Sequence, residues 1–496
     1  MLILLCFLCT VPPRCCSARL NLAILMFLGF AVVYGLRVNL SVAMVAMVNN
    51  TDPKPAQNRS VFHACPLPSG MENSSDTFPQ PAGVPQYPWD SATQGWLLGA
   101  FFFGYLCTQI PGGYLSGHYG GSIFLGLGVL GTAVLTLLTP LAAQMGSYWL
   151  FALRALEGFG EGVTFPAMMA MWARWAPPLE RSRLMTLSGS GASFGAFLSL
   201  PLTGYICQAF GWPAVFYLCG GAGCLWAVFW FIFVSDDPRT HRRISEEERD
   251  YIINSIGHQL VDKGEGHGWS LPLVDMLLSV PLWAIIVTQM CANWSYYTLL
   301  TSLPTYMDNI LHFDLKSNGF LSALPYLGAL LVSALSGVVA DLLIERKVFS
   351  VTTVRKIFTV MGLVPSAALL VAVGYSGCSH VLTVTFLTLS ATIGGTSAPG
   401  VFMNQIDIAP RYAGFLLGIT NTFGTIPGVV APIVTGYFTE DHTLAGWRKV
   451  FWVAAGISVG GALFFMMFGS GKLQSWAITE EERAEAEKKR SRSIST

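Results

Sequence analysis

Charged residues are scarce in this 496-residue chain, since Asp, Glu, Lys and Arg together make up only 11% of it. A soluble domain carries about 25% charged residues, so the composition excludes an ordinary soluble globular enzyme. The 28 basic and 28 acidic residues cancel, which leaves no basic surplus for a nucleic-acid partner. The 11 cysteines show no metal-ligand spacing, and nucleophile–base, Walker-loop and zinc motifs are missing. We therefore expect no enzymatic activity, no metal and no cofactor.

Apolar residues are abundant instead and account for 53% of the chain. A membrane-crossing helix needs about 20 mostly apolar residues. Twelve stretches qualify, at residues 20–47, 92–116, 121–144, 148–173, 183–209, 213–234, 281–306, 318–341, 354–377, 380–405, 412–437 and 449–470. The sequence thus predicts an all-α polytopic membrane protein with twelve transmembrane helices in the lipid bilayer.

The longest polar gap splits these spans into six plus six. We expect five segments: a cytosolic N-terminus (1–19), a first six-helix half (20–234) with a luminal loop (48–91), a central cytosolic loop (235–280), a second six-helix half (281–470) and a cytosolic tail (471–496). In this orientation the cytosolic segments hold 21 of the 28 Lys and Arg residues and the opposite side holds 5. Such an excess is typical of the cytosolic side of membrane proteins. The start of the chain lacks the basic region of a cleaved signal peptide.

The predicted luminal loop carries three Asn-X-Ser/Thr triplets, which begin at Asn49, Asn58 and Asn73. Such triplets are glycosylation acceptors, so we expect glycans on this loop. Cys65 and Cys378 are the two cysteines in luminal loops. A disulfide between them and two free thiols are both compatible with the sequence.

The two halves repeat each other. Four residues of the fourth span and its end (Gly162, Pro166, Ala176 and Pro177) recur at a constant offset of 233 as Gly395, Pro399, Ala409 and Pro410. Two six-helix halves of like topology are the plan of the major facilitator fold, in which the substrate lies near mid-membrane between the halves. We therefore expect this fold.

Four charged residues fall well inside the spans: Arg37 in the first, and Arg154, Glu157 and Glu161 on one face of the fourth. Each costs about 2.5–3.5 kcal/mol at a helix centre, so each must pair or line an aqueous cavity. An Arg154–Glu157 ion pair is one interpretation, but it leaves Arg37 and Glu161 unexplained. The other is a proton-coupled carrier, in which Arg37 binds an anionic substrate and the two carboxyls exchange protons beside Arg154.

Four further residues are candidates for the substrate site: Tyr34, Tyr105, Asn293 and Tyr297. Aromatic rings with polar tips suit a polyhydroxylated ligand, although ordinary helix packing also explains them. Tyr34 lies one turn before Arg37 and is expected to share its cavity.

Six motifs resemble the vesicular and lysosomal anion transporter family over about residues 15–477. They are RVNLS (37–41), TQIPGGY (108–114), EGVTFPA (161–167), WAPPLERS (175–182), LPTY (303–306) and DIAP (407–410). CCSAR (15–19) and YPWD (87–90) are most similar to the branch that carries sialic acid. Members of that branch have lysine, histidine and histidine where this chain has Ser122, Met169 and Gln405.

The resemblance implies proton-coupled export of sialic acid and other acidic sugars from the lysosome. We also expect a monomer. It assigns the substrate arginine to Arg37, the coupling acids to Glu157 and Glu161, and aromatic positions near the substrate to Tyr105 and Tyr297. Acidic amino acids are an alternative cargo, as are nucleotides, urate and sodium-coupled phosphate. The synaptic vesicle and the plasma membrane are the alternative locations. A non-transporting receptor or scaffold is a remote alternative, because it would not need buried charges.

Overall fold

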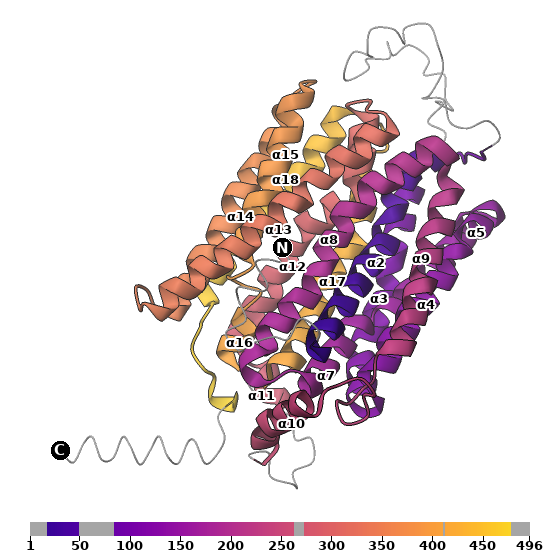
Figure 1. The fold of residues 1–496 in the computed structure, drawn as a ribbon. Coiled ribbons are helices and arrows are strands. Elements are labelled where there is room, and N and C mark those ends of the chain that lie inside the picture. The colour runs from indigo at the N-terminus through magenta and orange to yellow at the C-terminus, as the bar shows by residue number, and fades with distance from the viewer. Residues whose placement is uncertain (1–16, 49–83, 262–271, 410–411, 478–496) are drawn as a thin grey trace, which may run out of the picture. The chain divides into compact units, whose positions relative to one another are not determined.

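The computed structural model describes residues 17–48, 84–261, 272–409 and 412–477 (Figure 1). Regular structure in these residues is helical, apart from an isolated bridge between Val48 and Tyr87. The chain forms two compact units. The first contains the described residues of 1–59, 69–267 and 312–323, and the second contains those of 60–68, 268–311 and 324–496.

The helices of the first unit are α2 (Ala18–Met47), α3 (Ser91–Tyr119), α4 (Gly121–Leu137), α5 (Thr139–Met145), α6 (Ser147–Glu161), α7 (Thr164–Trp175), α8 (Pro178–Phe210), α9 (Trp212–Phe233) and α10 (Glu246–Val261). Helix α2 packs most extensively on α8, α3 on α6, and α4 on α9. Asp90 begins α3 by accepting a hydrogen bond from the Thr93 amide at 3.1 Å, as expected of an N-cap.

The second unit contains α11 (Leu273–Leu277), α12 (Val280–Asn309), α14 (Val351–Tyr375), α15 (His380–Gly394), η1 (Gly395–Ser397), α16 (Asn404–Ile408), α17 (Ala413–Phe438), α18 (Leu444–Phe468) and η3 (Ser475–Ala477). Helix α13 (Leu315–Glu345) begins in the first unit and continues in the second. Within the second unit, α12 packs on α17 and α18, and α14 packs on α15 and α18.

All twelve predicted spans are helical. Six described helices are long and apolar enough to cross a membrane alone, and α4 with α5, bent by 48°, makes a seventh. The other five predicted spans are richer in polar residues (α3, α8 and α12) or interrupted (α6–α7 and α15–α16). Membrane helices tolerate such interruptions where neighbouring protein satisfies the freed backbone groups.

The predicted repeat is visible as matching breaks in two spans. Helix α6 ends before Gly162, and α15 ends before Gly395. A Cβ added to Gly162 would lie 2.6 Å from the carbonyl oxygen of Tyr105, and one added to Gly395 would lie 2.6 Å from that of Ala329. Both breaks therefore occur where a glycine lets the neighbouring helix approach closely, α3 in one unit and α13 in the other.

Helix α10, which the sequence interpretation did not foresee, caps the N-terminus of α2. The Glu248 carboxylate accepts hydrogen bonds from the Ser17 hydroxyl at 2.5 Å, the Ala18 amide at 3.0 Å and the Arg19 Nε at 2.9 Å. Ile252 of α10 is fully buried in the apolar cluster that contains Ala18. An acidic group at a helix N-terminus satisfies donors that the helix itself cannot.

Partial burial of Glu248 opposes its ionisation, but hydrogen bonds from Ser17, Ala18 and Arg19 outweigh this and lower the pKa of the carboxyl. A carboxyl with a lowered folded-state pKa stabilises the fold above its unfolded pKa, about 4.3 for Glu. That stabilisation is lost as the pH falls through the folded-state pKa. The cap is therefore complete at neutral pH.

Replacing Glu248 with Gln is expected to destabilise the protein by about 0.5–2 kcal/mol at pH 7, the usual cost of a lost helix cap. The loss should stay constant from pH 8 to about 5 and shrink below about 4, where the wild-type carboxyl also becomes neutral. Thermal unfolding of detergent-purified protein across this pH range measures it. Glu246→Gln, at an exposed position in the same turn, is the matched control. Equal stability of wild type and Glu248→Gln at pH 7 would contradict the cap.

Cys378 is disulfide-bonded, whereas Cys107, Cys207, Cys219, Cys224 and Cys291 are free thiols. Its candidate partner Cys65 lies outside the described residues, as do the predicted glycosylation sites Asn49, Asn58 and Asn73.

Candidate substrate and proton site

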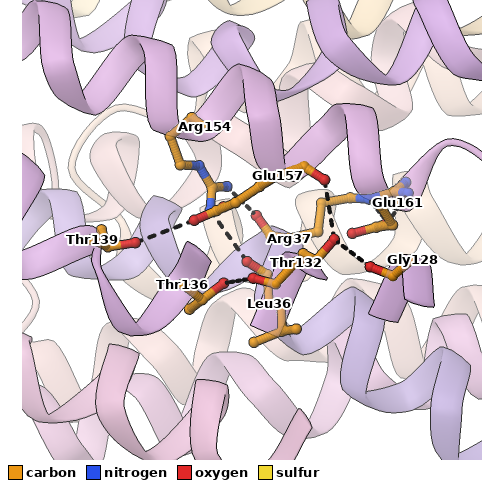
Figure 2. A network of polar contacts seen from close by, with 9 residues as sticks. All are labelled: Leu36, Arg37, Gly128, Thr132, Thr136, Thr139, Arg154, Glu157 and Glu161. Atoms are coloured by element: carbon orange, nitrogen blue, oxygen red, sulfur yellow. Dashed lines mark hydrogen bonds and ion pairs between the residues drawn. The ribbon is translucent and has the colours of Figure 1, made fainter. Parts of the chain in front are cut away.

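The four charged residues predicted inside the spans lie in one buried network of the first unit (Figure 2). Glu157 and Glu161 are fully buried, and Arg154 and Arg37 are 1% and 5% exposed. Arg37 Nε donates to Glu161 Oε1 at 2.9 Å, and Arg37 Nη2 donates to the same oxygen. The other oxygen of Glu161, Oε2, has no hydrogen-bond partner among the described residues. One face of this carboxyl therefore holds the arginine while the other is free to carry a proton.

Arg154 joins the fourth span to the backbone of the first. Its Nη1 donates to Glu157 Oε2 at 2.6 Å, so the predicted ion pair exists. The same guanidinium donates from Nη1 to the Leu36 carbonyl at 3.3 Å and from Nη2 to the Arg37 carbonyl at 3.0 Å. Arg154 thus holds the stretch of α2 that carries Arg37, and Glu157 orients Arg154.

Hydroxyl groups of α4 and α5 also donate hydrogen bonds to Glu157. Thr139 donates to Glu157 Oε1 at 3.2 Å, and Thr132 donates to the Glu157 carbonyl at 3.1 Å. Thr136 donates to the Thr132 carbonyl at 2.8 Å (Figure 2). Both carboxylate oxygens of Glu157 are therefore engaged, in contrast to those of Glu161.

Aromatic rings surround the Arg37 guanidinium. Its central carbon lies 4.4 Å from the ring centre of Tyr34, 4.7 Å from that of Tyr105 and 5.0 Å from that of Phe101. These distances are those of cation–π contacts. Tyr34 was expected to share the cavity of Arg37, and Tyr105 was expected near the substrate. Phe101 was missed, although it lies one turn before Tyr105 on the same face of α3.

Two glycines at the crossing of α3 and α6 allow this arrangement. A Cβ on Gly104 would lie 2.6 Å from the Phe159 amide nitrogen, and one on Gly158 would lie 3.0 Å from that of Tyr105. Small residues let helix backbones approach closely in membranes. The approach carries Phe101 and Tyr105 to the face of α6 that bears the charges.

Asn293 and Tyr297, also predicted for the site, belong to α12 of the second unit. Asn293 Nδ2 donates to the Gly424 carbonyl at 2.8 Å. Tyr297 is buried, and its ring centre lies 5.4 Å from that of Tyr296. Among the described residues, no cluster of three His, Cys, Asp or Glu side chains has the arrangement of a metal site.

Comparison with known proteins identifies the family. Residues 23–432 match the model of the Major Facilitator Superfamily. The chain belongs to this superfamily. Its predicted fold is thereby confirmed, and it is a membrane transport protein rather than an enzyme.

Relatives within the superfamily include anion transporters, as the motifs predicted. Human sialin is 51% identical over 472 residues, which cover 94% of this chain and 92% of sialin. Vesicular glutamate transporter 3 of Danio rerio is 38% identical over 462 residues, covering 93% of this chain and 75% of the relative. A bacterial homologue of the human lysosomal transporter Spinster, crystallised inward-facing and unoccupied, superposes with a TM-score of 0.68 at 13% identity, covering 94% of this chain and 100% of that one.

Proposed function

We propose that this protein is a proton-coupled carrier that exports sialic acid and other acidic sugars from the lysosome by alternating access. The observation that carries the proposal is the pairing of Arg37 with Glu161. A buried cation that never loses its charge is held by a carboxyl that can lose its own. The 51% identity to human sialin supports the choice of cargo.

This pairing couples the anion to the proton by competition for one guanidinium. When Glu161 takes up a proton, its attraction for Arg37 falls, and Arg37 becomes available to the carboxylate of the cargo. Two parallel N–H···O bonds from arginine to a carboxylate favour that exchange. After the cargo leaves on the other side, Glu161 releases its proton and pairs with Arg37 again. Proton and anion therefore move in the same direction.

Arg154 and Glu157 serve this exchange as positioning residues. Arg154 holds the carbonyl groups of Leu36 and Arg37, so the α2 backbone stays in place while the Arg37 side chain changes partner. Tyr34 and Tyr105 hold the guanidinium in place, with their ring centres 4.4 Å and 4.7 Å from its central carbon.

Acidic amino acids are the second candidate cargo, favoured by the 38% identity to a vesicular glutamate transporter. They present the same carboxylate to Arg37. We place the protein in the lysosomal membrane, with synaptic vesicles as the alternative, both termini in the cytosol, and glycans at Asn49, Asn58 and Asn73. We propose a monomer, because all the residues that the coupling needs belong to one chain.

Uptake into liposomes that contain the purified protein tests the function. With an acidic exterior, labelled sialic acid is expected to accumulate inside, and a protonophore should abolish the accumulation. Aspartate and phosphate, with and without sodium, are measured in the same vesicles. Sialic acid uptake that ignores the pH gradient, or sodium-driven phosphate uptake in its place, would overturn the proposal.

A further inference from the structure

Three arginines follow closely after the end of α9 in the sequence. They are Arg239, Arg242 and Arg243, here called the arginine cluster, and all three are exposed, while α9 itself ends at Phe233. Among the described residues, none of the three takes part in an ion pair. An arginine side chain is not deprotonated in proteins. The cluster therefore presents three permanent positive charges that are not paired within the described part of the chain.

The last turns of α9 indicate where the membrane ends. Helix α9 is apolar enough to cross a membrane, and its residues Phe229, Ile232 and Phe233 are 46%, 62% and 39% exposed. Large apolar side chains on the outside of a spanning helix face lipid tails, because contact with water would be unfavourable. The chain becomes polar directly after the helix, beginning with Ser235 and Asp236. The hydrocarbon layer therefore ends close to Phe233.

His241 holds the arginine cluster at this level. Its Nε2 donates to the Phe233 carbonyl at 3.2 Å, and its Nδ1 accepts from the Arg243 amide at 3.2 Å. A neutral imidazole makes both bonds at once, since one ring nitrogen donates while the other accepts. The central carbon of the Arg243 guanidinium lies 4.5 Å from the ring centre of Phe233. Arg243 thus lies where α9 leaves the lipid tails and the head groups begin.

Two carboxylates lie in the same loop, but both bond to backbone amides. Asp236 Oδ1 accepts from the Ser122 amide at 2.7 Å, and Asp237 Oδ1 accepts from the Arg239 amide at 2.8 Å. These bonds fix the loop on the start of α4 and within its own turn. The guanidinium groups are left to an anion from outside the protein, and their planar donor geometry suits phosphate oxygens.

We propose that the arginine cluster binds the head groups of anionic phospholipids in the leaflet beside it, with phosphorylated inositol lipids as the preferred class. Basic residues next to a spanning helix attract anionic head groups. Three fixed charges suit a head group with several negative charges better than phosphatidylcholine, which has none in excess. The inference concerns the lipid and not the cargo, so it goes beyond the proposed function. The proposed orientation adds only that this is the cytosolic leaflet.

Binding of fluorescent phosphatidylinositol 4-phosphate to the detergent-purified protein tests the cluster. Replacing both Arg242 and Arg243 with Gln is expected to raise the Kd about 25-fold, at about 5-fold for each arginine near the surface. Replacing both with Lys keeps the charge and should change the Kd less than about 3-fold. The matched control is Arg346→Gln with Lys472→Gln, which removes two exposed cations of the second unit and should leave the Kd unchanged. Added salt should weaken wild-type binding, because exposed charges are screened.

Unlabelled competitors identify what the cluster recognises. Unlabelled phosphatidylinositol 4-phosphate should displace the probe, whereas phosphatidylcholine and inorganic phosphate should not. Wild-type affinity in the double Gln variant, or displacement by phosphatidylcholine, would overturn the proposal. Displacement by inorganic phosphate as effective as that by the lipid would show a site for a soluble anion instead.

Thermal unfolding checks that each variant is folded. Should the double Gln variant not fold, Arg242→Gln alone is judged by the same constant, with an expected rise of about 5-fold. Because the assay measures lipid binding and not uptake, failure of the carrier function would leave its result unchanged, and a failed lipid test would leave the carrier function standing.

Discussion

Replacing Arg37 with Ala is expected to reduce sialic acid uptake about 100-fold or more. A charge-assisted hydrogen bond contributes about 1.5–3 kcal/mol, a bidentate arginine makes two, and about 1.4 kcal/mol corresponds to a factor of ten. No other cation of the network can replace it, because Arg154 is committed to Glu157 and to the α2 backbone. Arg37→Lys should also be poor, since a point charge loses the bidentate geometry. Uptake at equal amounts of protein in the membrane measures the effect.

Two companion variants keep this result interpretable. Arg37→Ala leaves Glu161 buried without its arginine, and removing one partner of a buried pair costs about 3–5 kcal/mol. The double variant Arg37→Ala with Glu161→Gln removes that unpaired charge and should be folded yet inactive. Arg346→Ala, at an exposed position at the end of α13, should transport normally. Wild-type uptake by well-expressed Arg37→Ala would refute the substrate role of Arg37.

Glu161→Gln is expected to abolish proton-driven accumulation while retaining exchange of labelled for unlabelled sialic acid. Gln mimics the protonated carboxyl permanently, so Arg37 no longer alternates between carboxyl and cargo. Binding of sialic acid should therefore persist, but residue 161 can no longer take up and release a proton during the transport cycle. The measurement compares gradient-driven uptake with counterflow in the same vesicles.

Glu157→Gln is the matched control, because it changes the neighbouring acid by the same chemistry. Both oxygens of Glu157 are engaged, by Arg154 and by Thr139, so its loss should loosen Arg154 and weaken transport. Proton dependence should survive with a shifted pH optimum. Normal proton-driven accumulation by Glu161→Gln would show that another group couples the proton.

The sequence predicts which charged residues lie inside the membrane spans better than it predicts how they pair. The cost of charge in a membrane singles out Arg37, Arg154, Glu157 and Glu161 from the sequence alone. Helical spacing also predicts that Arg154 and Glu157 meet. The Arg37–Glu161 pair joins residues 124 positions apart, on α2 and α6, and it depends on how far these two helices lie from each other in the fold. Periodicity along one helix carries no information about that distance.

The fold, too, was predicted only in part. The length of the apolar runs predicts all twelve spans, because the bilayer thickness sets that length. The interruption after Glu161 was not predicted, since a glycine inside an apolar run is compatible with a continuous helix. Helix α10 was also missed. Its stability comes from Ile252 and Glu248 packing on α2, and short polar helices depend on such tertiary contacts.

The cap on α2 also has a consequence for the order in which the protein is made. Glu248 accepts a hydrogen bond from the Ala18 amide and lies 230 residues after it in the sequence. Ribosomes add about 5–20 residues per second, so roughly 10–50 s pass between the synthesis of α2 and that of its cap. Throughout that time the amides at the start of the first span lack the acceptor that Glu248 provides in the folded protein. The translocation machinery, or water and lipid head groups at the membrane surface, must satisfy those amides until α10 emerges.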